Sequence, residues 1–219
     1  MGTKQSKTKE LICQTSIALF NEQGFSKVST NHIARAIPMS SGNLYYHYKN
    51  KMAITEDIYK KLEKSAFMML DLAKKIEDKR LLIDSYFMAL SSLLSSYHFF
   101  FSDLSEILRK SETLKNSYSQ MEKRFKSNLE DIITLLCGAA IFKPLDSKEE
   151  KKALASNIWI LAVSYFAMTD YSAKSLDAAK TIKALKKQLL YLLKPYVTKG
   201  EIHREGSIFS LIKVTQKTS

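Results

Sequence analysis

A short segment in the first quarter of the chain concentrates side chains that can hydrogen-bond to phosphate oxygens and base edges. It reads Ser40, Ser41, Gly42, Asn43, Leu44, Tyr45, Tyr46, His47, Tyr48. An asparagine amide carries both donors and acceptors, which suits a base edge, while hydroxyl, phenol and imidazole groups suit phosphate oxygens. Glycine lets the backbone approach another surface closely. The chemistry that these residue types support is non-covalent recognition of a polyanion.

Three flanking residues extend this set. Lys49 and Lys51 supply cations directly after the segment, and Thr30 precedes it with a hydroxyl that can bond a phosphate. Taken singly, each residue has an ordinary structural alternative. Aromatic runs on helices usually belong to a core, a lone histidine is usually a surface residue, and Thr30 or Asn50 can simply cap a helix. The functional interpretation depends on their occurrence together.

The elements that must position these residues are short helices. Apolar residues at helical spacing predict a helix over residues 6–23, which Gly24 ends. A second helix is predicted over 29–36, because Ile37 precedes Pro38 and is pushed out of the helical region. Ser40 is expected to cap a third helix, whose Leu44 and Tyr48 point back to the core. The pattern indicates a helix-turn-helix.

The rest of the chain is also predicted to be helical. Helices are expected over 51–76, 78–101, 102–110, 112–137, 147–171 and 175–197, with Ser147 and Glu150 as a capping box. Gly138 and Gly200 are expected just beyond helix ends. Glycine and proline are scarce, at six and three residues, and no segment alternates apolar and polar residues as a strand would. The prediction is an all-α fold of about nine helices.

The charge is uneven along the chain. The formal net charge is +12, and residues 1–51 hold seven cations against two carboxylates, a net +5. Nearly half of the excess therefore lies in less than a quarter of the chain. Such an asymmetry is typical of a surface that binds nucleic acid.

Residues 12–58 resemble the DNA-binding domain of the tetracycline-repressor (TetR) family. The matching pieces are Ile17-Ala18-Leu19-Phe20, Gly24-Phe25, Ser29-Thr30, Ile33-Ala34, the segment from Ser40 to Tyr48, and Lys49-Asn50-Lys51. The resemblance implies a homodimer that represses transcription at double-stranded operator DNA and is released by a small, largely apolar effector. It implies a DNA-binding domain at residues 1–51 and a ligand-binding and dimerisation domain at 52–200. Residues 201–219 are then a tail with room for a short helix.

Two positions depart from the family pattern. Pro38 stands where the family usually has a glycine, and proline cannot take a positive φ, so the turn must be built differently. Ser41 stands where the family often has a lysine, which removes one phosphate contact. Lys49 and the N-terminal Lys4, Lys7 and Lys9 can compensate, although a solvated terminus would have the same composition.

The larger domain contains candidates for an effector pocket and a dimer interface. Methionine and aromatic side chains line adaptable pockets, although they also fill ordinary cores. The pocket candidates are Met68, Phe87, Met88, Phe100, Met121, Phe125 and Tyr165. In the last long helix, a heptad-like seam suits a partner helix, although intrachain packing would give the same pattern. The interface candidates are Ile182, Leu185, Leu189, Leu192 and Tyr196, with Ile158, Trp159 and Ala162 on the preceding helix.

Other function classes find little support. No catalytic or nucleotide-binding motif, metal-ligand cluster, signal peptide or membrane-spanning stretch is recognised, and Cys13 and Cys137 lie far apart. We therefore expect a cytoplasmic, non-enzymatic regulator without metal or cofactor. A DNA-binding regulator that has no small-molecule ligand, and a helical ligand carrier that binds no DNA, remain alternatives.

Overall fold

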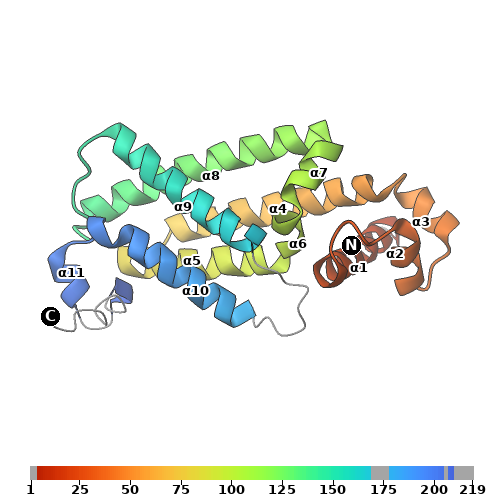
Figure 1. Cartoon of the computed structure of the whole chain (residues 1–219), viewed down its shortest axis with the longest axis horizontal. Coiled ribbons are helices and arrows are strands. Elements are labelled where there is room, and N and C mark those ends of the chain that lie inside the picture. The colour runs from red at the N-terminus through yellow and green to blue at the C-terminus, as the bar shows by residue number, and fades with distance from the viewer. Residues whose placement is uncertain (1–3, 169–177, 205–206, 210–219) are drawn as a thin grey trace. The chain divides into compact units, whose positions relative to one another are not determined.

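The computed structural model describes residues 4–168, 178–204 and 207–209, and within these ranges the chain forms helices and no strand (Figure 1). Within these ranges, Phe142 and Val197 form an isolated antiparallel β-bridge. The all-α prediction is confirmed. The predicted helix ends at Tyr171 and Ser175, and the tail beyond residue 209, lie outside the described residues.

The α-helices, in chain order, are α1 (Lys4–Gln23), α2 (Thr30–Ala36), α3 (Ser41–His47), α4 (Lys51–Lys74), α5 (Lys79–Ser96), α6 (His98–Ser102), α7 (Leu104–Lys110), α8 (Glu112–Gly138), α9 (Lys148–Met168), α10 (Ala178–Leu193) and α11 (Lys199–His203). A 3-10 helix, η1 (Lys194–Tyr196), follows α10.

Contacts divide the described residues into two compact units. The first contains residues 4–66, 93–119 and 166–168, and the second contains residues 67–92, 120–165, 178–204 and 207–209. The helices α4, α5, α8 and α9 each contribute residues to both units. The first unit therefore joins the predicted helix-turn-helix to α6 and α7, which lie far from it in the sequence.

Aromatic packing holds the first unit together. The Phe20 ring centroid lies 5.3 Å from that of Phe25 and 5.0 Å from that of Phe99. Ile33 from α2 and Leu44 from α3 are fully buried beside α1. Burying each such side chain contributes about 1.5–3 kcal/mol to folding. Two seven-residue helices, which would be unstable alone, are stable here because each inserts an apolar anchor into this core.

The predicted helix over 78–101 is found from Lys79 to Ser96, but it is not continuous, because the chain leaves the helix at Tyr97 and starts α6. The cause is a contact from α1. The Asn21 side chain donates to the Ser96 carbonyl at 2.9 Å and accepts from the Phe99 N–H at 3.1 Å. Phe99, Phe100 and Phe101 are consecutive residues of α6 and all three are buried, so this short helix is enclosed on more than one face.

Glycine is correctly predicted at one helix end and wrongly at two. Gly24 has φ 83° and its N–H donates to the Phe20 carbonyl at 2.9 Å, as a C′ glycine does. Gly138 instead closes α8, and the left-handed residue beyond it is Ala140, with φ 54°. Gly200 lies inside α11. Ala140 is held there because its carbonyl accepts from the Thr198 hydroxyl at 3.0 Å, a contact between residues 58 positions apart.

Candidate functional site

Serine caps define the two short helices of the predicted helix-turn-helix. The Ser29 hydroxyl accepts from the His32 N–H at the start of α2, and the Ser40 hydroxyl accepts from the Asn43 N–H at 3.2 Å at the start of α3. Such caps typically contribute about 1 kcal/mol. Ile37 ends α2 in an extended conformation, with φ −113° and ψ 146°. The predicted roles of Ser40 and Ile37 in local structure are confirmed.

Pro38 is accommodated by a tighter turn than a glycine would make. The Met39 N–H donates to the Ile37 carbonyl at 2.6 Å, which closes a three-residue turn around Pro38. Because proline fixes φ near −65°, this is an inverse γ-turn, which needs no positive φ. Leu44 is fully buried, so α3 still packs on the core.

The remaining face of α3 is exposed. Tyr45 is 50% exposed and Tyr46 is 75% exposed, although tyrosine usually buries most of its ring. Ser40, Ser41, Gly42, Asn43 and Lys49 are also exposed, and Thr30 and His47 are half-buried. A Cβ placed at Gly42 would meet no atom within 4 Å, so the fold itself does not require a glycine there.

Two hydrogen bonds between side chains of α2 and α3 arrange this face. The hydroxyls of Thr30 and Tyr45 lie 3.2 Å apart, and the Ser41 hydroxyl donates to the Asn31 Oδ1 atom at 3.2 Å. The second bond leaves the Asn31 amide N–H groups directed away from Ser41. Asn31 is therefore a candidate DNA-contacting residue. Sequence reasoning missed it, because no local pattern links residues ten positions apart.

Lys51 is bonded within the protein. Its Nζ atom donates to the Phe25 and Val28 carbonyls at 2.8 Å each and lies 4.2 Å from the Phe25 ring centroid. Burial and the nearby Lys110 lower the pKa of the Lys51 ammonium. These contacts hold the loop between α1 and α2, and a phosphate contact by Lys51 stays a prediction.

His47 is partly withdrawn from solvent. Its Nδ1 atom is buried and has no hydrogen-bond partner in the described structure, and its ring packs edge-on against Tyr46 at 5.2 Å between centroids. The Nδ1 atom therefore does not face solvent, which leaves Nε2 for any contact with a phosphate. The DNA contacts of all ten predicted residues stay predictions.

The second unit contains an apolar cavity of about 60 Å³, whose surrounding side chains present only apolar surface to it. Helices α5, α8, α9 and α10 supply nearly all of this lining. The lining residues are Ile83, Tyr86, Phe87, Leu90, Leu129, Ile132, Ile133, Leu136, Phe142, Ile158, Leu189 and Leu193. Such a cavity favours an uncharged, apolar occupant.

Most of the predicted pocket residues do not line this cavity. Among them Phe87 lines the cavity. Met68 and Met88 are 55% and 74% exposed and do not line this cavity, so their place in an effector pocket stays a prediction. Phe100 is buried in the first unit, with its ring centroid 5.3 Å from that of Tyr59. Met121 and Phe125 are buried and Tyr165 is half-buried, and none of the three lines the cavity as described.

Half of the predicted dimer-interface residues are buried inside the single chain. Leu185 and Leu189 of α10 are 1% and 2% exposed, and Trp159 and Ala162 of α9 are also buried. The Trp159 ring centroid lies 4.9 Å from that of Phe125 of α8. Ile158, Ile182, Leu192 and Tyr196 are half-buried. The four buried side chains pack within the chain, while Ile160 and Tyr191 of the same helices are 55% and 38% exposed.

Among the described residues no group of three or more His, Cys, Asp or Glu side chains has an arrangement that could hold a metal ion. The helices described there also include none with the length and hydropathy that crossing a membrane requires.

Known proteins resemble this chain over nearly its whole length. Residues 12–58 match the family model described as bacterial regulatory proteins of the tetR family, and residues 59–204 match the one described as bacterial transcriptional repressor. IcaR of Staphylococcus epidermidis, a negative transcriptional regulator of the biofilm operon icaADBC, is 23% identical over 194 residues, which cover 87% of this chain and 100% of IcaR. A probable acrEF/envCD operon repressor of Escherichia coli K12 is 34% identical over 53 residues, 24% of either chain.

A solved structure agrees with these matches. A TetR-family transcriptional regulator from Marinobacter aquaeolei VT8 superposes with a TM-score of 0.82 at 28% identity, covering 97% of this chain and 98% of that one. The matched relatives are transcriptional regulators, and the two family models together account for residues 12–204. This chain therefore belongs to the TetR family of bacterial DNA-binding transcriptional repressors.

Proposed function

We propose that this repressor binds its operator through the exposed side chains of α2 and α3, and that a small, uncharged and largely apolar effector releases it. As in the family, the protein acts as a dimer, so two α3 helices enter successive major grooves about 34–36 Å apart. The site of action is the bacterial cytoplasm, where the operator DNA lies.

The main support for this DNA-binding surface is the exposure of two adjacent tyrosines on α3, a helix that is anchored to the core from its other side. Tyr45 and Tyr46 are half or more exposed, while Leu44 between α3 and the core is fully buried. Exposed aromatic side chains with polar tips are favoured where a surface meets a partner. The two hydroxyls can donate to phosphate oxygens, and Asn43, at the exposed start of α3, can reach a base edge.

The experiment is selection of duplexes from a random-sequence library, followed by titration of the selected duplex and a scrambled duplex of equal length. The selected duplex is expected to contain two half-sites related by two-fold symmetry and to bind far more tightly than the scrambled one. Affinity for both should fall steeply with salt, because several phosphates are neutralised. Equal affinity for the two duplexes would contradict the proposal.

The cavity in the second unit supports the effector half of the proposal. Its lining is apolar, which disfavours a charged ligand, but its volume of about 60 Å³ is well below the roughly 300 Å³ of an ordinary ligand pocket. An effector must therefore move the lining helices in order to enter. Since α4 contributes residues 51–66 to the first unit and 67–74 to the second, one continuous helix can carry such a change to the residues that follow α3.

A screen of uncharged apolar compounds tests the effector. A true effector should raise the unfolding temperature of the free protein and release the selected duplex. By linkage, the bound duplex must weaken effector binding by the same factor as the effector weakens DNA binding. If tightly bound compounds never change DNA affinity, the alternative of a DNA-binding regulator without a small-molecule ligand is favoured.

A further inference from the structure

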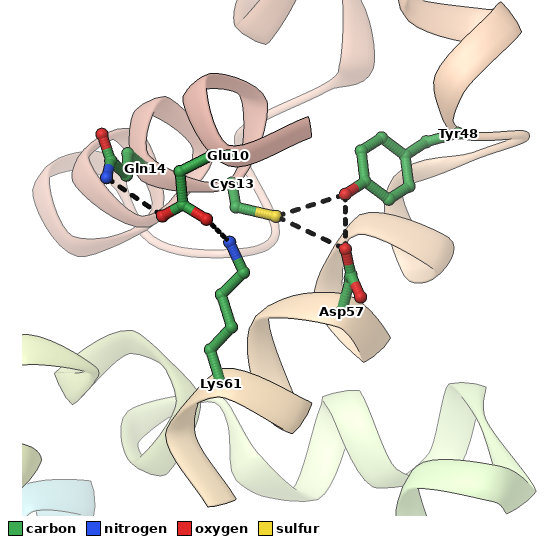
Figure 2. Close-up of polar contacts among 6 residues, drawn as sticks. All are labelled: Glu10, Cys13, Gln14, Tyr48, Asp57 and Lys61. Carbon is green, nitrogen blue, oxygen red and sulfur yellow. Dashed lines mark hydrogen bonds and ion pairs between the residues drawn. The ribbon is translucent and has the colours of Figure 1, made fainter. Parts of the chain in front are cut away.

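The phenol hydroxyl of Tyr48 lies inside the first unit and connects three helices (Figure 2). Tyr48 is the C-cap of α3, and its hydroxyl donates to the Asp57 Oδ2 atom of α4 at 2.6 Å. The Cys13 Sγ atom of α1 lies 3.3 Å from the same hydroxyl and 3.9 Å from the same carboxylate oxygen. The C-cap residue of α3 is thus bonded to both α1 and α4.

This contact is more than filling of the core. Tyr48 is 5% exposed and Cys13 is fully buried, so the hydroxyl has been removed from water and needs a partner. A carboxylate is the stronger of its two partners, because hydrogen bonds to charged acceptors are shorter and about twice as strong as neutral ones. Burial, and next the bond to Asp57, raise the pKa of the Tyr48 phenol, so the hydroxyl keeps its proton and stays a donor.

The bond to Asp57 gives α3 a directional link to α4, in addition to the Leu44 anchor and the side-chain bonds of α3 to α2. α3 has seven residues, and Leu44 is its buried residue. An apolar anchor resists withdrawal from the core but permits rotation about itself, since dispersion contacts have little directionality. A short hydrogen bond fixes direction as well as distance. Asp57 lies in the second turn of α4, so the bond relates the orientation of α3 to that of α4.

A neighbouring ion pair between α1 and α4 provides a natural control. Glu10 of α1 forms an ion pair with Lys61 of α4, one turn along from Asp57 (Figure 2). The side chains of Lys61 and Glu10 are 31% and 50% exposed, and neither belongs to α3. A pair of this kind contributes little to stability. It joins α1 to α4 without touching the recognition helix.

We propose that Asp57 is a positioning residue for operator binding: by accepting the hydrogen bond of Tyr48, it fixes the orientation in which α3 is presented to the DNA groove. This inference rests on the proposed function, because it assumes that α3 reads the operator. Asp57 itself touches no DNA. Its loss should therefore reduce the preference for operator over other DNA, while the phosphate contacts that bind all sequences are kept.

The test uses the full-length protein, the duplex selected by the wild type, and a scrambled duplex of equal length. The variants are Tyr48→Phe, Asp57→Leu, the double variant and Asp57→Asn, with Glu10→Gln as the matched control. For each, the Kd for both duplexes, the salt dependence of binding and the urea midpoint of unfolding are measured.

Either single variant should weaken binding to the selected duplex about tenfold, the effect of one hydrogen bond to a charged group, with less than a twofold change on the scrambled duplex. Asp57→Asn keeps an acceptor oxygen and should recover most of the preference. The double variant is decisive, because replacing both partners by apolar groups leaves neither a phenol nor a carboxylate unpaired, and only the weakly polar Cys13 thiol loses its contacts. Its urea midpoint should return toward that of the wild type while its operator preference stays low.

Three outcomes would overturn the positioning role. They are a double variant with wild-type operator preference, a loss of affinity that is equal on both duplexes, and a Glu10→Gln variant that behaves like Asp57→Leu. A wild-type protein without preference for its selected duplex would instead overturn the proposed function itself, so the two failures are distinguishable.

Discussion

Helices α3 and α10 both carry large side chains at regular spacing, but they place them in opposite environments. Tyr45 and Tyr46 of α3 are 50% and 75% exposed, whereas Leu185 and Leu189 of α10 are 1% and 2% exposed. These two leucines are covered within their own chain, while Ile182, Leu192 and Tyr196 of the same seam are half-buried. The α3 tyrosines have no such cover, so their exposure, and not periodicity, supports the proposed DNA-binding surface.

The two units also differ in the polar groups that they present. Around α3 they are hydrogen-bonded across helices, as Thr30 is to Tyr45 and Ser41 is to Asn31. The cavity in the second unit presents no polar surface. A face of fixed donors suits an anionic, hydrogen-bonding partner, while a small apolar cavity suits a ligand held by packing. The four predictions that follow test this contrast.

The largest effect is expected from a charge placed in the buried seam. Leu189→Asp should destabilise the fold by several kcal/mol, because an unpaired carboxylate replaces a side chain that lines the apolar cavity. Urea unfolding followed by circular dichroism measures the loss. Tyr191→Asp, two positions away and 38% exposed, should lower the unfolding midpoint far less.

The same pair locates the dimer interface. If α10 contributes its exposed face to the dimer, Tyr191→Asp should yield a folded monomer in sedimentation experiments, with weakened operator binding. If Tyr191→Asp instead remains a dimer as tightly associated as the wild type, the interface does not include this face of α10.

The second prediction concerns Gly42. Gly42→Val should fold normally, because a Cβ at this position meets no protein atom within 4 Å, yet it should weaken operator binding by about 100-fold by holding α3 away from the groove. Gly42→Ala, which adds a single methyl group, should have a smaller effect. Wild-type affinity in a folded Gly42→Val protein would remove the start of α3 from the interface.

The third prediction separates a structural cation from one that contacts phosphate. Lys51→Met should lower stability by about 1–3 kcal/mol, because the Phe25 and Val28 carbonyls lose a charged donor. The exposed Lys49 is the matched control, and Lys49→Met should leave stability unchanged while reducing the salt dependence of DNA binding. If Lys51→Met is as stable as wild type but binds DNA weakly, then the predicted phosphate contact is its main role.

Sequence reasoning predicts best what is encoded locally. The Ser40 cap, the left-handed Gly24 and the extended Ile37 before Pro38 each follow from one or two residues, and all three are found in the structure. The anchoring of α3 by Leu44 follows from helical spacing and is also found. These local signals were sufficient to place the short helices and to identify the exposed face.

Contacts between distant residues account for what the sequence could not predict. The break at Tyr97 depends on the Asn21 side chain, the left-handed Ala140 on Thr198, and the internal bonds of Lys51 on two carbonyls of an earlier loop. The exposure of Met68 and Met88 could not be predicted either, because residue type does not determine which face of a helix points outward. The same limit applies to Asp57, whose partner lies nine positions away and in another helix.

The smallest effect is expected at the more exposed of the two α3 tyrosines. Tyr46→Phe removes one hydroxyl from a side chain that is 75% exposed, so stability should not change. Because a phosphate contact positions the protein without specifying sequence, binding to the selected and the scrambled duplex should weaken by the same few-fold factor. This behaviour is the reverse of that expected for Asp57→Leu, which should affect the selected duplex alone. A selective loss in Tyr46→Phe would instead mean that the phenol reads a base edge, and the division between contacting and positioning residues on α3 would have to be redrawn.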